Sequence, residues 1–306
     1  MMRARPVWRS LLYVPAHVER FVERAHLRGA DCIQLDLEDS VPHAEKARAR
    51  AAVAGAARKL RRGANDVLVR INAALSLAVP DIAAAIGPDV DGLIITKVHG
   101  PDHLRLLDEL VAECEQAACV PVGHTWLYPL IETPEALAQA HAIAAASPRI
   151  VAMGLGGEDF ATAIGAEPTE EALSVPKQMA LHAARAAGVM PLGLLGTLAG
   201  FADLDAFVAM AVRSRRMGFE GASCINPVQV PALNAAFTPG AAETDLAQRI
   251  IAAAAEAAAQ GLGAVALDGR MIDAPIIRRA EQLLARAQAI AAREAAHGSN
   301  LGHKTP

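Results

Sequence analysis

The chain has 306 residues and a formal net charge of −4, with lysine and arginine spread along the sequence and not gathered in a basic stripe. This distribution excludes the charge pattern typical of nucleic-acid binding. No segment approaches the roughly 20 consecutive apolar residues that a membrane-spanning helix needs, so no membrane contact is expected. Hydrophobic residues make up 53% of the chain and aromatic residues 3%, an alanine-rich composition typical of helix-rich α/β proteins.

The cysteines and the N-terminal segment indicate a cytoplasmic protein. Four cysteines, at positions 32, 114, 119 and 224, form no CxxC pair and no regular framework, so reduced thiols are expected. The apolar segment near the N-terminus is interrupted by Arg9 and ends at Pro15. It is too short and broken to be the hydrophobic region of a signal peptide.

Strand-like apolar runs alternate with helix-like segments through most of the chain. The runs expected to form strands lie at residues 10–14, 32–37, 67–71, 92–98, 126–131, 150–155, 190–195 and 222–225. Helical periodicity follows between them, for example at 44–60, 101–116, 134–146, 176–187 and 204–217. This succession of β-α units predicts an α/β fold, a (β/α)8 TIM barrel. An open doubly wound sheet also alternates, but the chain lacks GxGxxG after the first strand and lacks GxxxxGK[ST].

The pattern changes after residue 236. A long helix is expected at 242–260, a hairpin at Asp268-Gly269, and a final helix from residue 274 to residue 293. Residues 237–296 therefore form a helical and hairpin extension of a barrel made by residues 1–236. We expect this extension to lack an independent core and to pack on its own barrel or at a subunit interface. The polar segment 297–306 is expected to be a disordered tail.

Two carboxylates stand where consecutive predicted strands end. Glu132 follows the run at 126–131, and Asp159 follows the run that ends near Gly156. The helical segment between these strands makes them parallel neighbours, so both acids should emerge side by side at one face. A pair of carboxylates without cysteine or histidine beside it suits Mg²⁺. Each acid alone could instead cap the helix that follows it, but their pairing on adjacent strands favours the metal.

Other charged residues follow the second, third and fourth predicted strands. Arg70 should point into the barrel mouth and bind a substrate carboxylate, unless it forms a structural ion pair with a strand-end acid. Asp36, Glu38 and Asp39 would repel one another unless they pair with Arg70, Lys46 or metal-bound water, and Glu38 and Asp39 are expected beside the metal site. Asp39 and Ser40 could instead cap the helix that Pro42 opens, and for Ser40 capping is favoured. Lys97 could hold an anionic group. A carboxylate-rich mouth raises the pKa of a lysine and disfavours a Schiff-base role.

The dipeptide Asn226-Pro227 follows the eighth predicted strand. It could position a substrate carbonyl, but turn formation is the more frequent role of such a dipeptide. The histidines show no HxH or HExxH spacing, so a zinc site is not expected.

Several short motifs occur together in one order along the chain. They are RSLLYVP at 9–15, LDLEDSV at 35–41, VRIN at 69–72, IET at 131–133, GGED at 156–159, FTP at 237–239 and DGRMIDAP at 268–275. On these motifs the chain resembles the citrate lyase β-subunit-like (CitE-like) branch of the HpcH/HpaI aldolase superfamily.

The resemblance implies a magnesium-dependent TIM barrel, usually a homotrimer or hexamer, that cleaves or forms a carbon–carbon bond in a 3-hydroxyacyl thioester. By motif position, Glu132 and Asp159 would be the metal ligands. Arg70 would bind the carboxylate of a 2-oxo acid, and the amides of Gly157 and Glu158 would support that contact.

The implied chemistry is a retro-Claisen cleavage of a citramalyl-CoA or malyl-CoA type of substrate to acetyl-CoA and a 2-oxo acid. Magnesium would stabilise the alkoxide, and Asp273 of a neighbouring subunit would be the acid/base that serves the thioester enolate. The alternatives are a citryl thioester lyase subunit acting on an acyl carrier protein, an aldolase acting on free 2-oxo acids, and a non-catalytic scaffold. The Met-Ile-Asp segment favours a thioester, and the intact acids and Arg70 disfavour the scaffold.

Overall fold

The computed structural model describes residues 5–63, 65–197 and 203–302. The chain divides into two compact units, Met1–Phe237 and Thr238–Pro306. The division lies close to the boundary at which the hydrophobic pattern of the sequence changes.

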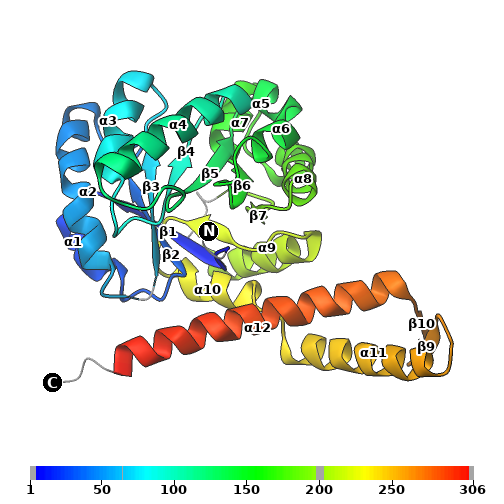
Figure 1. The fold of residues 1–306 in the computed structure, drawn as a ribbon. Helices are drawn as coiled ribbons and strands as arrows, with labels where there is room; N and C mark the ends of the chain where they lie inside the picture. Colours follow the sequence, from blue (N-terminus) through cyan, green and yellow to red (C-terminus); the bar gives the residue numbers. More distant parts are fainter. Residues whose placement is uncertain (1–4, 64, 198–202, 303–306) are drawn as a thin grey trace. The chain divides into compact units, whose positions relative to one another are not determined.

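The first unit is built on parallel strands. They are β1 Ser10–Pro15, β2 Cys32–Asp36, β3 Asp66–Ile71, β4 Gly92–Ile95, β5 Trp126–Ile131, β6 Ala152–Leu155, β7 Met190–Leu192 and β8 Ala222–Cys224. Neighbours in the chain pair with one another from β1 to β7, and β8 pairs with β1 (Figure 1). A parallel bridge between Leu192 and Gly221 joins the remaining edges. The predicted (β/α)8 barrel is therefore confirmed.

Helices surround these strands (Figure 1). They are α1 Glu19–Ala25, the 3-10 turn η1 His43–Glu45, α2 Lys46–Leu60, α3 Leu75–Ala85, α4 Pro101–Ala117, α5 Pro134–Ala138, α6 Ala140–Ala144, α7 Gly157–Ala163, α8 Glu170–Ala186, α9 Leu204–Met217 and α10 Gln229–Ala236. Their buried faces carry small and branched apolar residues at helical spacing, as in α2 with Ala49, Val53, Ala56 and Leu60. These faces pack on the outer side of the strands and form the larger apolar core.

Side chains fill the inside of the barrel. Trp8 and Trp126 pack edge to face, with ring centroids 5.8 Å apart and planes at 77°. Leu11, Cys32 and Leu68 belong to the same buried cluster. A barrel filled in this way offers chemistry at the loops that follow its strands, not through its axis.

Two expected helices have different boundaries. The helix expected at 176–187 begins at Glu170, and Pro176 lies inside it. The side chain of Thr169 accepts a hydrogen bond from the amide of Ala172, so an N-cap starts the helix before the proline that we took as its first residue. The helix expected at 134–146 is divided into α5 and α6 at Gln139.

The second unit contains α11 Ala241–Ala259, β9 Val265–Leu267, β10 Arg270–Ile272 and α12 Ala274–Gly302. The two strands are antiparallel, and Asp268 and Gly269 between them have φ values of 49° and 74°, as a tight hairpin turn requires. The predicted hairpin is therefore confirmed.

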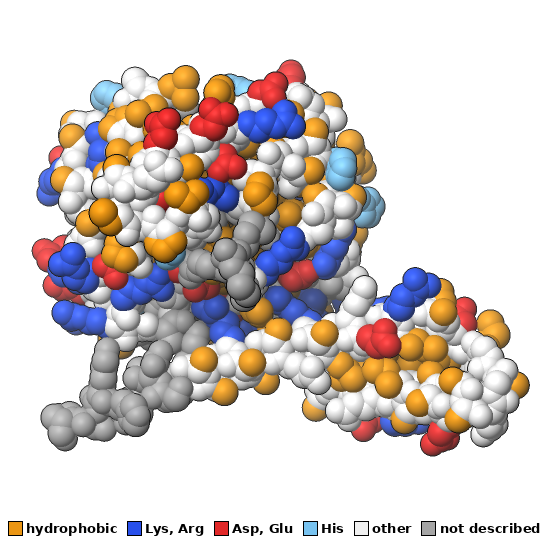
Figure 2. All heavy atoms as spheres, in the orientation of Figure 1, with side chains coloured by type: hydrophobic (Ala, Val, Ile, Leu, Met, Phe, Trp, Pro, Cys, Tyr) orange, Lys and Arg blue, Asp and Glu red, His pale blue; other side chains and the backbone are white. Residues whose placement is uncertain are grey.

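The extension has a small apolar cluster of its own, which we did not expect. Hydrophobic side chains gather between α11 and α12 (Figure 2). The buried members are Ala247, Ile250, Ile272 and Ala280. The sequence pattern does not reveal this core, because its apolar residues are divided between two helices and a hairpin that meet only in three dimensions.

The expected disordered tail is also shorter than the polar pattern suggested. Helix α12 continues to Gly302, because each residue added to an established helix gains a backbone hydrogen bond without a new nucleation cost. The rest of the expected tail, residues 303–306, lies outside the described residues. None of the described helices is both long and apolar enough to cross a membrane.

Candidate active site

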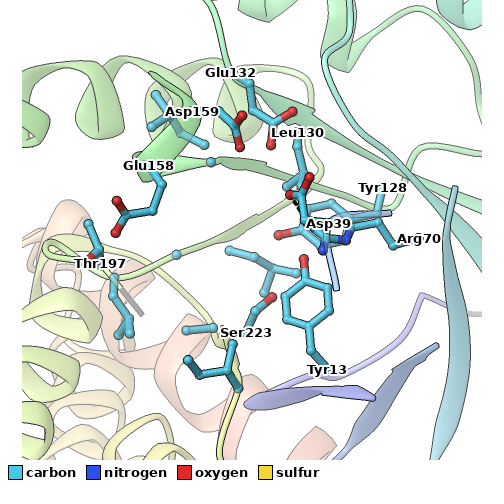
Figure 3. Close-up of a pocket in the computed structure, with 18 of the residues that line it drawn as sticks. Tyr13, Asp39, Arg70, Tyr128, Leu130, Glu132, Glu158, Asp159, Thr197 and Ser223 are labelled. Carbon is cyan, nitrogen blue, oxygen red and sulfur yellow. Dashed lines mark hydrogen bonds and ion pairs between the residues drawn. The ribbon is translucent and has the colours of Figure 1, made fainter. Parts of the chain in front are cut away.

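A pocket of about 480 Å³ opens at the carboxyl ends of the barrel strands (Figure 3). Its walls come from strand residues such as Arg70 of β3 and from the segments that follow β2, β5, β6 and β7. The charged residues that line it are Asp36, Asp39, Arg70, Glu132, Glu158, Asp159 and Lys177. Most of the residues singled out from the sequence therefore meet in one cavity.

Glu132 and Asp159 lie together on one side of this pocket (Figure 3). Glu132 follows β5 and is 3% exposed, whereas the side chain of Asp159, in the first turn of α7, is 39% exposed. Strands β5 and β6 pair with Ile131 opposite Leu155, and this register sets the two acids side by side. The placement matches the expectation from the strand ends.

The environment of Glu132 favours a cation. Burial raises the pKa of Glu132 to about 7, and the charge of Asp159 acts in the same direction. Both side chains offer only oxygen atoms, which suits Mg²⁺. Within the described parts of the chain, no group of three or more His, Cys, Asp or Glu side chains is arranged to hold a metal. Water and substrate oxygens would therefore complete the coordination of an ion bound by this pair.

Gly156 permits the close approach of the two strand ends. A Cβ atom at this position would lie 2.7 Å from the Cγ atom of Glu132 and would overlap its carboxylate. Any side chain at position 156 would therefore displace the buried acid.

Lys97 contacts three acidic residues at this end of the barrel, Glu132, Glu38 and Asp159. Its φ of 48° lies in the left-handed region, which costs a non-glycine residue about 1–3 kcal/mol and is often found at functional sites. In this conformation the amide of Lys97 donates to Oε2 of Glu132 at 2.5 Å. The Nζ atom donates to Oε1 of Glu38 at 2.7 Å and lies 3.4 Å from Oδ1 of Asp159.

The charge of Lys97 follows from these contacts. Burial alone would lower the pKa of Lys97, but the hydrogen bond to Glu38 and the charges of Glu132 and Asp159 raise it above its usual value. A permanently charged ammonium cannot be the free amine that attacks a carbonyl, which agrees with the argument against a Schiff base.

Arg70 is held by the acids that follow β2. Its Nε and Nη2 atoms each donate to Asp36 at 2.7 Å, and Nη1 lies 3.0 Å from Glu38 and 3.3 Å from Asp39. The guanidinium carbon lies 4.7 Å from the centroid of the Tyr13 ring. Arg70 therefore forms the strand-end ion pair considered as an alternative, and it also lines the pocket.

In the loop after β2, the alternative of an ion pair with Lys46 and the expected helix cap are not realised. Lys46 donates at 2.7 Å to the backbone carbonyls of Leu37 and Glu38 and pairs with none of the loop carboxylates. The turn η1 begins after Pro42 without a side-chain cap, so Asp39 does not cap it and the cap expected from Ser40 is wrong. Proline at that position already fixes the backbone at the start of the turn, and Asp39 remains free to face Arg70.

The remaining expected site residues lie at different places. Gly157 and Glu158 line the pocket in the first turn of α7. Asn226 is not a lining residue of this pocket, because its Oδ1 accepts a hydrogen bond from the amide of Val228 at 3.1 Å. The alternative of turn chemistry thus describes Asn226, and Pro227 lines a neighbouring cavity.

Asp273 belongs to the second unit. It lies between β10 and α12, and its carbonyl accepts the amide hydrogen bonds of Ile276 and Ile277. The residues that line the pocket all belong to the first unit.

Lys177 is a pocket residue that the sequence analysis missed. Its Nζ atom is buried and donates to the carbonyls of Leu195, at 3.2 Å, and Gly196. Burial lowers the pKa of Lys177 to about 8. A lysine on the buried face of α8, four residues after Leu173, is the sequence signal that could have revealed it.

Comparison with known proteins identifies the family. The family model described as HpcH/HpaI aldolase/citrate lyase matches residues 9–227. The chain belongs to this family. The citrate lyase subunit beta of Leuconostoc mesenteroides is 33% identical over 92% of this chain and 93% of its own length. A (3S)-malyl-CoA thioesterase of Cereibacter sphaeroides is 35% identical over 93% of this chain and 96% of its own length. The resemblance inferred from the motifs is confirmed.

Solved structures support the same assignment. CitE from Mycobacterium tuberculosis, in complex with magnesium, acetoacetate and coenzyme A, is 26% identical with a TM-score of 0.73, covering 94% of this chain and 100% of that one. A citrate lyase from Burkholderia xenovorans is 21% identical with a TM-score of 0.79 over 95% of this chain and 94% of that one, a likeness of fold.

Replacing Gly156 tests whether the geometry of Glu132 matters for metal binding. Gly156→Ala should weaken Mg²⁺ affinity at least tenfold, because the new methyl group displaces the buried carboxylate. Isothermal titration with Mg²⁺ measures the effect. Gly55→Ala is the matched control, because its Cβ would meet nothing within 4 Å and alanine favours helix α2. Equal Mg²⁺ affinity in the two variants would argue against the role of Glu132.

Lys177 should impose a pH dependence on stability. Its pKa of about 8 lies below the unfolded value of about 10.4, so between these pH values the unfolded chain binds more protons and the free energy of unfolding rises with pH. We expect wild type to gain on the order of 2 kcal/mol relative to Lys177→Met from pH 8 to pH 10. Urea denaturation at several pH values measures the difference. Parallel stability curves for the two proteins would contradict the shift.

Proposed function

We propose that the protein is a magnesium-dependent carbon–carbon lyase that cleaves a citramalyl-CoA or malyl-CoA type of thioester to acetyl-CoA and a 2-oxo acid. The observation that carries the proposal is the convergence of Glu132, Asp159 and Arg70 on one pocket of a citrate lyase family barrel. The Mycobacterium tuberculosis relative, which contains magnesium, acetoacetate and coenzyme A, supports both the metal and the carrier.

The acid pair and Arg70 recognise different groups in the part of the substrate that becomes the 2-oxo acid. A magnesium ion held by Glu132 and Asp159 would polarise the oxygen atoms of this half of the substrate. Arg70 binds the carboxylate, with the amides of Gly157 and Glu158 in support. Because Asp36 already fixes the guanidinium through two 2.7 Å hydrogen bonds, little side-chain freedom is lost on binding.

Glu38 and Asp39 set the position and charge of the cations in the pocket. Glu38 lies against both Arg70 and Lys97, at 3.0 Å and 2.7 Å. Burial raises the pKa of Glu38, whereas the charges of Arg70 and Lys97 oppose that rise. We assign Glu38 and Asp39 to the support of Arg70, where they hold it in place for the substrate.

A second cavity supports coenzyme A as the acyl carrier. It measures about 350 Å³ and shares Tyr13, Ser40 and Ile225 with the active pocket. Arginines spaced four residues apart, at positions 20, 24 and 28, line it together with the apolar residues Leu12, Val14, Phe21 and Ala25. Guanidinium groups suit phosphates, and apolar walls suit a nucleotide base.

The same cavity helps to distinguish a CoA thioester from the alternative substrates. An aldolase acting on free 2-oxo acids binds no nucleotide, so it would not need the arginines that line this cavity. A carrier protein would dock over a broad surface, whereas this site is a concave cavity of about 350 Å³. We therefore favour free CoA thioesters.

Hydrolysis is the second candidate function, because a relative with 35% identity is a (3S)-malyl-CoA thioesterase. The two reactions differ in their products. A lyase breaks the carbon–carbon bond and leaves the thioester intact in acetyl-CoA, whereas a thioesterase releases free CoA and the intact hydroxy acid.

The products decide the function. Purified protein with Mg²⁺ should convert malyl-CoA or citramalyl-CoA to acetyl-CoA with glyoxylate or pyruvate, measured by chromatography and mass spectrometry. Citryl-CoA and a citryl carrier protein complete the panel. Asp159→Ala should lose at least 100-fold in rate while keeping its fold, because a partly exposed acid at a strand end contributes little to the core. Full activity of this variant in EDTA-treated buffer would contradict the metal assignment, and free CoA as the main product would identify a thioesterase.

We further propose a cytoplasmic homotrimer or hexamer in which Asp273 of one subunit protonates the thioester enolate in the site of another. The position of Asp273 at the end of a hairpin, in a unit separate from the pocket residues, supports this assignment. A structural role at the start of α12 is the competing explanation, because the backbone carbonyl of Asp273 accepts hydrogen bonds from the amides of Ile276 and Ile277 in the first helical turn.

Subunit mixing separates these roles. Asp273→Asn and Arg70→Ala should each be inactive alone, and exchanged hetero-oligomers should regain part of the activity because some sites receive both intact residues. Asp268→Asn on the same hairpin is the control and should remain active, because Asp268 is exposed and pairs only with Arg249 among the described residues. If no activity returns after subunit exchange has been verified, the role of Asp273 lies within its own chain.

A further inference from the structure

Tyr13 places an unassigned hydroxyl group in the active pocket. Strand β1 carries the side chain to the wall opposite Glu132 and Asp159, and the hydroxyl points into the cavity (Figure 3). No described residue forms a hydrogen bond with it. The other tyrosine of the pocket, Tyr128, differs because its hydroxyl interacts with Ser223.

The ring of Tyr13 is held in place. The guanidinium of Arg70 lies 4.7 Å from the ring centroid, and Arg70 is itself fixed by Asp36. Burial raises the pKa of the Tyr13 hydroxyl, and the nearby charges of Asp36 and Glu132 act in the same direction, whereas Arg70 opposes them. The group is therefore a fixed, neutral hydrogen-bond donor.

The position of Tyr13 fits a thioester better than a 2-oxo acid. Tyr13 lines both the active pocket and the arginine-lined cavity. A substrate would place its nucleotide in that cavity and its 2-oxo acid half at Glu132 and Asp159. The thioester connects these two parts of the substrate, so it would lie beside Tyr13.

We infer that Tyr13 is a catalytic residue whose hydroxyl donates a hydrogen bond to the thioester carbonyl oxygen, the atom that becomes the enolate oxygen. The inference rests on the proposed lyase function. When the carbon–carbon bond breaks, its electron pair passes to the α-carbon of the thioester and delocalises onto this oxygen. The O–H bond of Tyr13 stays intact throughout, and the proton that the α-carbon finally takes comes from a separate acid.

The surroundings make such a donor valuable. Asp36, Glu38 and Asp39 lie around Arg70 on the same side of the pocket, and their negative charges oppose a developing oxyanion. A neutral hydroxyl can stabilise that oxyanion without forming an ion pair with the carboxylates. Losing one such donor in an enzyme typically lowers the rate by about 100-fold to 1000-fold.

Tyr13→Phe tests the inference because it keeps the ring over Arg70 and removes one oxygen atom. We expect kcat to fall about 100-fold, with KM for the 2-oxo acid and Mg²⁺ affinity changed by less than about twofold. Exchange of the methyl hydrogens of acetyl-CoA with deuterium, followed by mass spectrometry, measures enolate formation directly. This exchange should slow by a similar factor.

Tyr128→Phe is the matched control, because it also removes a pocket hydroxyl, but one with a protein partner. It should lower the melting temperature and leave kcat near that of wild type. Unchanged turnover and exchange in Tyr13→Phe would overturn the inference, as would equal losses of kcat in the two variants. A wild-type protein that cleaves none of the thioesters would overturn the proposed function and the role of Tyr13 with it, whereas an active wild type matched by Tyr13→Phe would overturn the role of Tyr13 alone.

Discussion

Electrostatic repulsion among carboxylates is the constraint on which the site depends. Acids lie at the end of β2 and shortly after the ends of β5 and β6, and parallel strands bring those acids to one end of the barrel. Arg70 and Lys97 hold them there, Arg70 through a bidentate pair with Asp36 and Lys97 between Glu38 and Asp159. The strained backbone of Lys97 is the local cost of this arrangement. A divalent cation at the acid pair would reduce the remaining repulsion, so the fold and the proposed cofactor depend on the same balance of charge.

Two lysines stiffen the loops around these charges in the same way. Lys46 donates to the successive carbonyls of Leu37 and Glu38, and Lys177 donates to those of Leu195 and Gly196. Each ammonium thus satisfies loop carbonyls that no strand pairs, and it ties a pocket wall to a surrounding helix. Loops fixed in this way can present substrate-binding groups with little entropy left to lose.

Local patterns in the sequence predicted the barrel and the acid pair, because strand ends, parallel neighbours and helix periodicity are all short-range signals. The partners of Arg70 remained open between substrate and ion pair, since the contact with Asp36 spans 34 residues. Lys177 was missed for the same reason, because its carbonyl partners lie 18 and 19 residues away. Asn226 was open to either role until its turn hydrogen bond to Val228 was visible.

The closure of the barrel is uneven. Strands β7 and β8 have three residues each, and a single bridge between Leu192 and Gly221 joins this side of the sheet. Gly221 has to be a glycine, because a Cβ there would overlap the carbonyl oxygen of Trp8. Among the described residues, this seam has fewer paired residues than the other contacts between neighbouring strands, so local opening and amide exchange should begin there. The acid pair lies away from this seam, after β5 and in the first turn of α7, so the barrel can open locally at the seam while the side that carries the acid pair keeps its register.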